Sequence, residues 1–265
     1  MKTKIQKNKY KLLLLVIVML VFVDLVLHKG LVRFLIPKTF INYPIENIDP
    51  INRNGFLNTN KNWVKAVNTP ERMESITSEN AGIELDIYYD TLKNIFDVHH
   101  DPDKSLEQNF EDLLIIYKRK NLQASIWMDF KNADEANVTR ALETLKQLRE
   151  KYNLQNKILV ESSYPNLLKL FSDNLFYTSY YTPYFNPYLA TEKENKIYLD
   201  TITALLKKYP VHALSGYYFQ MPFLHQQFPD FPILIWSPND KWSVVNRLYK
   251  TRINRDSNVF ISLYN

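Results

Sequence analysis

The sequence predicts an α/β protein: a small (β/α)8 barrel, the TIM-barrel architecture, preceded by a single N-terminal transmembrane helix. Three observations support this fold class. Eight strand-like segments with intervening helical segments begin at residues 63, 83, 122, 158, 175, 211, 231 and 259. Charged and amide side chains gather at the C-terminal ends of these segments, the face on which such barrels carry their sites. An apolar run precedes them. A doubly wound open sheet is the alternative architecture.

The N-terminus carries a topology signal. Five lysines, at positions 2, 4, 7, 9 and 11, precede an apolar run over 12–27 that is broken only by Asp24 and can extend towards Ile36. No small-x-small cleavage pattern follows, which favours an uncleaved anchor over a removed signal peptide. We expect a basic cytoplasmic arm over 1–11, a signal anchor over 12–36, a linker over 37–61 and a barrel domain over 62–265. The positive-inside rule places the barrel outside the cytoplasm of a single-pass protein.

Composition excludes several classes of function. Once the five lysines of the arm are set aside, 28 basic residues face 28 acidic ones, so the charge gives no reason to expect a nucleic-acid partner. Only four glycines are present, and neither GxGxxG nor GxxxxGK[ST] occurs. The chain has no cysteine, which excludes thiolate metal sites, disulfides and a thiol nucleophile.

The predicted strands are short apolar segments, several of them alternating with polar residues at a period of two. They cover 63–67, 83–88, 122–130, 158–160, 175–180, 211–217, 231–236 and 259–264, and a further short run covers 95–98. Helical spacing of apolar residues, or a helix-start signal such as Thr69-Pro70, marks the segments between them. These predicted helices begin at Thr69 or cover 105–120, 133–152, 166–171, 192–209 and 241–251.

The stretch 81–101 (AGIELDIYYDTLKNIFDVHHD) concentrates the polar chemistry of the chain. Alternation along the first strand puts Glu84 and Asp86 on one face, roughly 7 Å apart along the strand. The run 95–98 then leads to His99, His100 and Asp101. Two acids, two histidines and a further acid can form a hard-cation site with an acid/base group beside it. The alternative is a half-exposed hairpin whose polar face is merely solvated.

Four pieces, in this order and spacing, resemble a known superfamily. They are WVKAVN (63–68), GIELD (82–86), HHDP (99–102) and WMDFK (127–131), with WSPND (236–240) as a weaker fifth piece. The pattern is similar to that of the phosphatidylinositol-phospholipase-C-like phosphodiesterases. The nearest members are the glycerophosphodiester phosphodiesterases, the sphingomyelinase-D-type enzymes and the menorin-like proteins. The resemblance covers most of 62–240, and its first half is the specific part.

The resemblance implies that Glu84, Asp86 and Asp129 hold one divalent cation, Mg²⁺ or Ca²⁺. Three carboxylates without a thiol suit such a hard cation. Lys131 would add positive charge beside the phosphate, and His100 would be one of two acid/base histidines. Asn68 would hydrogen-bond within the phosphate or metal shell. By their positions at the ends of predicted strands, Glu161 and Trp236 are further candidates for substrate contacts.

One departure from the pattern concerns the first histidine, whose place is taken by Lys65. A lysine has a reference pKa near ~10.4, so it is almost fully protonated at neutral pH. It can supply electrostatic stabilisation, whereas work as a general base requires a pKa lowered by several units. His99 is a substitute by position, but on a regular strand it faces away from His100. The metal half of the predicted site is therefore complete and its acid/base pair is not.

Some polar and aromatic residues keep two interpretations. Glu161 can have a functional role, as an acid that supports Lys131 or as a contact to a substrate headgroup. The alternative is a charge at the start of the following helix. The run 177–188, with five tyrosines and a phenylalanine, either borders the barrel mouth or forms an ordinary rigid loop. Two functions remain open. The first is a membrane-anchored, metal-dependent phosphoric diester hydrolase acting on a glycerophosphodiester, a phospholipid headgroup or a related phosphodiester. The second is an inactive barrel that binds a phosphate-containing or lipid ligand.

Overall fold

The structure, a computed structural model, describes residues 2–35, 38–51, 63–105, 107–238, 240–257 and 259–264. It divides into two compact units. The first contains Met1–Thr39 and Pro238–Asp256, and the second contains Phe40–Ser237 and Ser257–Asn265. The second unit is the barrel.

The first unit consists of three helices: α1 (Lys2–Leu27), α2 (Lys29–Leu35) and α9 (Val244–Arg255). Within α1 the segment Lys9–Leu27 has a mean hydropathy of 2.7, is not buried, and is long and apolar enough to cross a membrane. The predicted N-terminal apolar helix is confirmed. The helix is interrupted at His28, where a single turn residue separates α1 from α2, and Ile36 lies outside the described residues.

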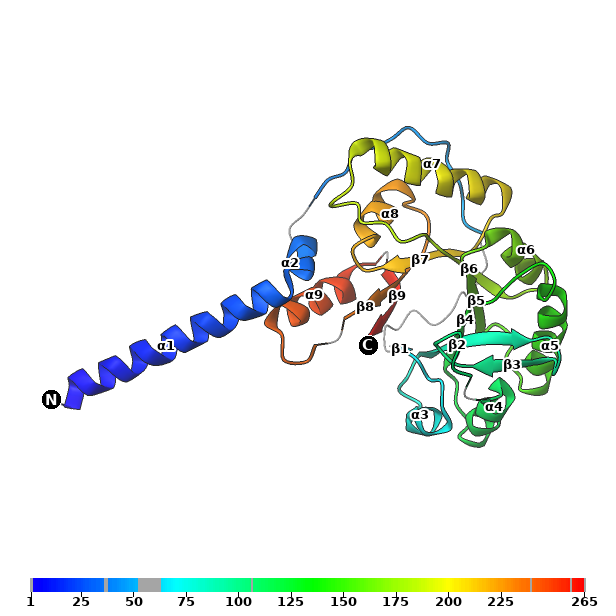
Figure 1. Ribbon diagram of the computed structural model, residues 1–265, viewed down its shortest axis with the longest axis horizontal. Coiled ribbons are helices and arrows are strands. Elements are labelled where there is room, and N and C mark those ends of the chain that lie inside the picture. Colours follow the sequence, from blue (N-terminus) through cyan, green and yellow to red (C-terminus); the bar gives the residue numbers. More distant parts are fainter. Residues whose placement is uncertain are drawn as a thin grey trace. The chain divides into compact units, whose positions relative to one another are not determined.

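The second unit is a closed barrel of eight parallel strands within the part of the chain described (Figure 1). These are β1 (Trp63–Val64), β2 (Gly82–Asp90), β4 (Ser125–Phe130), β5 (Ile158–Ser162), β6 (Tyr177–Tyr181), β7 (Ala213–Tyr217), β8 (Ile233–Ser237) and β9 (Val259–Tyr264). The ring closes because β1 pairs in parallel with both β9 and β2. The predicted (β/α)8 class is confirmed, and closure excludes the open-sheet alternative. The predicted run 95–98 is β3 (Ile95–Val98), antiparallel to the outer half of β2.

Helices lie outside the ring of strands in Figure 1. They are α3 (Pro70–Ser75), α4 (Phe110–Arg119), α5 (Val138–Lys151), α6 (Pro165–Asp173), α7 (Glu192–Lys208) and α8 (Met221–Gln227). Thr69 caps α3 and Thr191 forms a capping box with Glu194 at α7, as their sequence positions indicate. The short helix α8 was not predicted.

Of the boundaries that differ from the prediction, two have a clear local cause. The prediction that α4 begins at Ser105 was wrong, because Val98 N–H donates to Gln108 O (2.8 Å) and Asp97 bridges to Asn109. These contacts hold the chain extended until Asn109 caps the helix. Strand β6 begins at Tyr177 because Leu175 has a left-handed φ of 65°, which a strand does not accommodate.

The predicted linker lies partly in the described chain. Residues 38–51 form neither helix nor strand, and residues 52–62 and Pro37 lie outside the described ranges. Residues 40–51 are nevertheless held to the barrel unit. Phe40 N–H donates to Gln226 Oε1 (2.9 Å), and Ile51 N–H donates to Val211 O (2.9 Å).

The barrel interior is layered, with an apolar layer beneath a polar one. The buried apolar layer consists of Trp63, Ala81, Trp127, Leu159, Tyr177, Ala213, Leu234, Ile261 and Leu263. Gly82 makes room for it, because a Cβ there would lie 2.3 Å from the Trp63 ring. Each strand supplies its next inward position two residues later. The inward residues that follow Trp127 and Leu159 are Asp129 and Glu161, so the polar layer lies at the C-terminal end of the strands.

Candidate functional site

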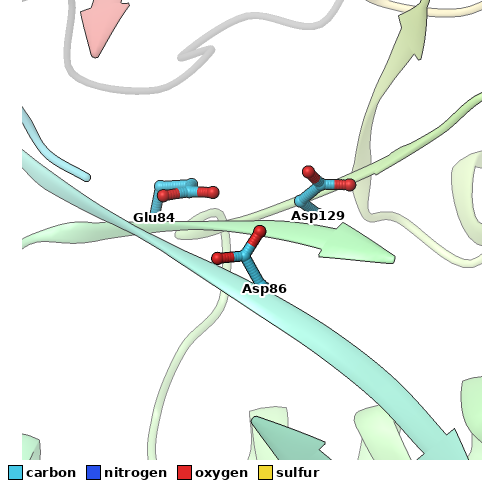
Figure 2. Close-up of side chains that lie close together, drawn as sticks. All are labelled: Glu84, Asp86 and Asp129. Atoms are coloured by element: carbon cyan, nitrogen blue, oxygen red, sulfur yellow. The ribbon is translucent and has the colours of Figure 1, made fainter. Parts of the chain in front are cut away.

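Three buried carboxylates converge at the C-terminal end of the barrel. Glu84 and Asp86 extend from β2 and Asp129 from β4, where Asp86 and Asp129 are paired in register. One oxygen from each residue lies within 4.8 Å of the other two. Figure 2 shows the three side chains pointing toward a common space. The structure therefore brings together all three residues that the resemblance assigns to the cation.

The turn after β1 holds two of these acids in place through hydrogen bonds. Ala66 adopts a left-handed φ of 54°, which non-glycine residues seldom adopt, and its N–H donates to Glu84 Oε2 (2.6 Å). Asn68 makes two hydrogen bonds with Asp86: its Nδ2 donates to Asp86 Oδ2 (2.7 Å), and its Oδ1 accepts from the Asp86 N–H (3.0 Å). Asn68 thus positions Asp86, and one oxygen of each acid is fixed by the β1 turn.

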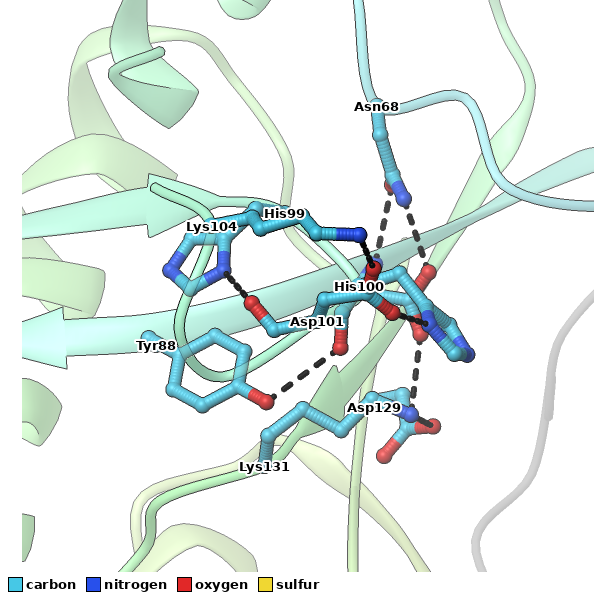
Figure 3. A network of polar contacts seen from close by, with 9 residues as sticks. Asn68, Tyr88, His99, His100, Asp101, Lys104, Asp129 and Lys131 are labelled. Carbon is cyan, nitrogen blue, oxygen red and sulfur yellow. Dashed lines mark hydrogen bonds and ion pairs between the residues drawn. The ribbon is translucent and has the colours of Figure 1, made fainter. Parts of the chain in front are cut away.

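Lys131 is the positive centre of the cluster. Its Nζ lies 2.9 Å from Asp86 Oδ1 and forms a second ion pair with Asp129 Oδ2. Figure 3 shows Lys131 beside Asp129. Burial alone would lower the pKa of Lys131, but Asp129 and Asp86 outweigh it and hold the pKa above the ordinary value. Lys131 is therefore charged at every physiological pH.

The carboxylates carry more negative charge than Lys131 neutralises. Burial raises the pKa of Glu84 to about 8, with Asp86 and Asp129 adding repulsion, although the Ala66 N–H and Lys65 oppose the shift. Burial likewise raises the pKa of Asp129, against the effect of Lys131. Glu84 Oε1 is buried without a hydrogen-bond partner among the described residues. An oxygen-only donor set with one unpartnered oxygen fits a hard divalent cation.

Lys65 lies at the end of β1, on the rim of this cluster. Its carbonyl accepts a hydrogen bond from Arg72 Nη2 (2.7 Å), which fixes the backbone there. Its side-chain charge lowers the pKa of both Glu84 and Asp129, so the ammonium group acts on the site electrostatically.

The two histidines occupy different environments. The His100 side chain is 66% exposed, and its Nδ1 lies 2.9 Å from Asp101 Oδ1. His99 is 4% exposed and stacks on Tyr88 at 4.1 Å, with Nδ1 lying 2.8 Å from Asp101 O. The two rings thus differ in burial, and both contact Asp101, His99 at its carbonyl and His100 at its carboxylate. The His99 N–H donates to Asp86 O (3.1 Å), so the backbone of this loop adjoins the site while the His100 ring is paired with Asp101.

Glu161 lies beside Asp129 in the sheet and is fully buried. Neither of its carboxylate oxygens has a hydrogen-bond partner among the described residues, and the same holds for the hydroxyls of Ser179 and Ser215 on β6 and β7. Burial and the charge of Asp129 raise the pKa of Glu161 well above its ordinary value, and the nearby Ser215 and Lys131 offset only part of this. Neither serine was predicted, although their inward positions follow from the period of two.

An aromatic group lies at the ends of β6, β7 and β8. The Trp236 ring is 4.8 Å from Tyr181 and 6.3 Å from Tyr217. Tyr217 stacks on Phe219 at 5.4 Å, and the exposed Tyr184 packs edge-on against both. Residues of the run 177–188 are thus joined by Trp236, which was predicted at the site, and by Tyr217 and Phe219, which were not.

Comparisons with known proteins bear on the fold. No protein-family model and no curated protein matches the sequence. Among solved structures, a glycerophosphodiester phosphodiesterase from Parabacteroides distasonis aligns with a TM-score of 0.51 and 16% identity, over 77% of this chain and 93% of that one. A protein described as a glycerophosphoryl diester phosphodiesterase from Silicibacter pomeroyi aligns with a TM-score of 0.53 and 9% identity, over 80% and 90%. The chain thus has the barrel fold of these structures.

Proposed function

We propose that this chain is a membrane-anchored, divalent-cation-dependent phosphodiesterase-like protein. Its substrate would be a glycerophosphodiester, a phospholipid headgroup or a related phosphodiester. The observation that carries this proposal is the cluster of Glu84, Asp86 and Asp129 around Lys131, at the end of the barrel where such folds carry their sites. The fold likeness to phosphodiesterases supports it.

Glu84, Asp86 and Asp129 would hold Mg²⁺ or Ca²⁺. When bound, the cation would neutralise negative charge on phosphate oxygens as the transition state forms. Asn68 keeps Asp86 oriented for this role through its two hydrogen bonds. Lys131 supplies a fixed positive charge beside the phosphate, and Lys65 adds a second from the β1 end of the mouth. Glu161 and Trp236 are proposed to contact the substrate from β5 and β8.

His100 is the proposed acid/base group. It would protonate the leaving oxygen or accept a proton from the nucleophile, and rotation of its ring away from Asp101 would free Nδ1 for either role. His100 lies on a loop between β3 and α4 with a mostly exposed side chain, so this rotation needs no repacking of the core.

Two observations favour a second function, an inactive barrel that binds a phosphate-containing or lipid ligand. Lys65 replaces the first histidine of the resembled pattern, and the His100 ring is paired with Asp101. A site with its cation ligands and cationic side chains in place, but with an incomplete acid/base pair, binds anions without turning them over.

We also propose that α1 anchors the protein as a single-pass helix, with the N-terminus in the cytoplasm and the barrel outside it. The apolar segment Lys9–Leu27 and the preceding lysines support this orientation. A compartment-sensitive reporter fused after Asn265 should report an extracytoplasmic position. A cytoplasmic signal would overturn the topology and leave the barrel chemistry untouched.

The test of function uses the full-length protein in detergent with a panel of phosphodiesters, in Mg²⁺, in Ca²⁺ and in EDTA. Three results together would support the enzyme. EDTA abolishes hydrolysis, the variant Asp86→Asn has lost it, and the control variant Asp90→Asn still shows it. Cation binding without hydrolysis, and without any gain from Lys65→His, would support the inactive barrel. If no divalent cation binds and Asp86→Asn behaves like the parent, both functions fail.

A further inference from the structure

The carboxylate of Asp24 caps a helix that is distant in sequence. Asp24 is the only acidic residue of the apolar segment in α1, and its Oδ2 accepts hydrogen bonds from the N–H groups of Val244 (2.8 Å) and Val245 (3.1 Å) at the start of α9. His28 completes the junction: its Nδ1 lies 2.9 Å from Asp24 Oδ1 and its Nε2 lies 3.3 Å from Asp240 Oδ2. The charge in the apolar run therefore has a structural function, because it satisfies amides that a helix start leaves free.

These contacts fix the position of the α9 start along the axis of α1. Asp24 is three residues from Leu27, where the apolar segment ends, which corresponds to about 4.5 Å along the helix axis. The polar region on each side of a bilayer is about 5–8 Å thick. With α1 inserted in a bilayer, as proposed above, the first turn of α9 consequently lies close to the boundary between the acyl chains and the lipid headgroups.

The residues exposed at this turn have the composition of a membrane interface. Trp242 is 91% exposed, and Val244 and Leu248, one helical turn apart, are 51% and 56% exposed. The exposed Lys241 and Arg247 adjoin them. Tryptophan is enriched at the headgroup level, and basic side chains attract lipid phosphates. In water Trp242 would leave its whole ring hydrated, whereas at the interface the apolar part of the ring is buried.

We infer that Trp242, Val244 and Leu248, with Lys241 and Arg247, form a lipid-contacting collar at the extracytoplasmic end of α1. The inference rests on the anchoring proposed above and concerns a different surface from the barrel site. The collar is rigidly held, because α2 packs against α9 and Arg252 Nη1 donates to Leu35 O (3.0 Å). The partner is the phospholipid bilayer itself. Removal of α1 would also remove the Asp24 cap from the start of α9.

Tryptophan fluorescence tests the collar directly. Full-length protein is reconstituted into phosphatidylcholine vesicles with and without lipids brominated near the headgroup end of the acyl chain. Trp242 should be quenched, so the variant Trp242→Phe should lose most of the lipid-dependent quenching. The matched control Trp127→Phe removes a tryptophan buried inside the barrel and should keep it. Asp24→Leu, which removes the cap, should reduce the quenching, and Asp24→Asn, which retains an acceptor, should preserve it.

Alkaline carbonate extraction of the same vesicles separates failure of the collar from failure of the anchor. If the protein resists extraction and Trp242→Phe leaves the quenching unchanged, the collar proposal is wrong and the anchor proposal stands. Protein released by carbonate would overturn both. Retained protein with quenching lost only in Trp242→Phe would support the collar. The phosphodiester assay is independent of all three outcomes, because the collar contributes no residue to the barrel site.

Discussion

Lys131 Nζ lies 2.9 Å from Asp86 Oδ1 and also pairs with Asp129, so a single ammonium group joins carboxylates from two neighbouring strands. Without a cation, this contact is what allows the acids to lie so close together. With a phosphodiester bound, the same charge would face the phosphate. The pair therefore links the stability of the barrel end to its proposed function.

Replacing Lys131 with methionine should weaken both properties. The acids would lose their partner, and the free energy of unfolding in EDTA should fall by about 1–3 kcal/mol, below the range for a fully buried pair because a quarter of the side chain is exposed. Saturating Mg²⁺ should restore part of that loss. Any hydrolysis should fall on the order of 10²–10³-fold. Urea denaturation with and without EDTA measures the first effect.

The control is Lys169→Met, which removes an exposed ion pair with Asp173. Its free energy of unfolding should change by less than about 0.5 kcal/mol. If Lys131→Met were no more destabilising than this control, the proposed role of Lys131 in neutralising the acids would be wrong.

Stability without a cation should fall as the pH rises. Burial raises the pKa of Glu84 to about 8, and it raises the pKa of Asp129 and Glu161 in the same direction. A group whose folded pKa is raised stabilises the protein fully below its unfolded pKa, and this contribution is lost as the pH rises through the folded value. The Tm in EDTA should therefore decline between about pH 5 and 8.

The raised pKa values also predict how the affinity for a divalent cation depends on pH. A cation displaces the proton from Glu84, so its affinity should increase over the window in which metal-free stability declines. Calorimetric titration with Mg²⁺ or Ca²⁺ at several pH values measures it. Glu84→Gln should flatten the dependence of the EDTA Tm on pH, and an unchanged slope in that variant would contradict the assignment.

Asn68→Ala should destabilise the barrel without touching the acids themselves. The substitution frees the Asp86 N–H and removes the donor to Oδ2, both in buried surroundings, which should lower the free energy of unfolding by about 1–3 kcal/mol. Asn47→Ala is the control, because Asn47 bonds to Asp49 on an exposed segment. Equal effects of the two substitutions in urea denaturation would argue against a positioning role for Asn68.

The apolar layer can be tested at Gly82. An alanine Cβ there would lie 2.3 Å from the Trp63 ring, so Gly82→Ala should lower the free energy of unfolding by about 1–3 kcal/mol through overpacking. Trp63→Leu added to that variant should return part of the loss, since a smaller side chain relieves the clash. Thermal denaturation of the single and double variants measures the coupling. Strictly additive effects would show that the two residues do not compete for the same space.

The sequence was informative where local pattern decides the outcome. Alternation along β2 was enough to place Glu84 and Asp86 on one face, and the order of the short motifs brought in Asp129 and Lys131. It was uninformative where distant segments meet. Nothing near Asp24 indicates that its carboxylate caps a helix beginning at Val244, because that contact depends on tertiary structure.

The direction of single side chains and the presence of short helices could not be predicted from local sequence patterns either. The pairing of the His100 ring with Asp101 was not predicted, because ring orientation on a loop has no sequence period. Helix α8 spans only seven residues and contains a proline, too few for a helical repeat to be recognised. Ser179 and Ser215 were reachable from the strand period, yet single serines among aromatic neighbours carry no functional signal of their own.

Glu161 provides the last prediction, because its buried carboxylate oxygens have no close hydrogen-bond partner among the described residues, which costs stability. Glu161→Leu should therefore raise the free energy of unfolding at pH 8, by about 1–3 kcal/mol, since it removes a polar group buried without compensation. The same variant should raise KM for a hydrolysed phosphodiester, or weaken ligand binding to an inactive barrel, if Glu161 contacts the ligand. Glu161→Gln separates charge from shape, because it keeps the size of the side chain and removes the titration. A stabilised Glu161→Leu with unchanged KM or ligand affinity would exclude Glu161 from the binding site.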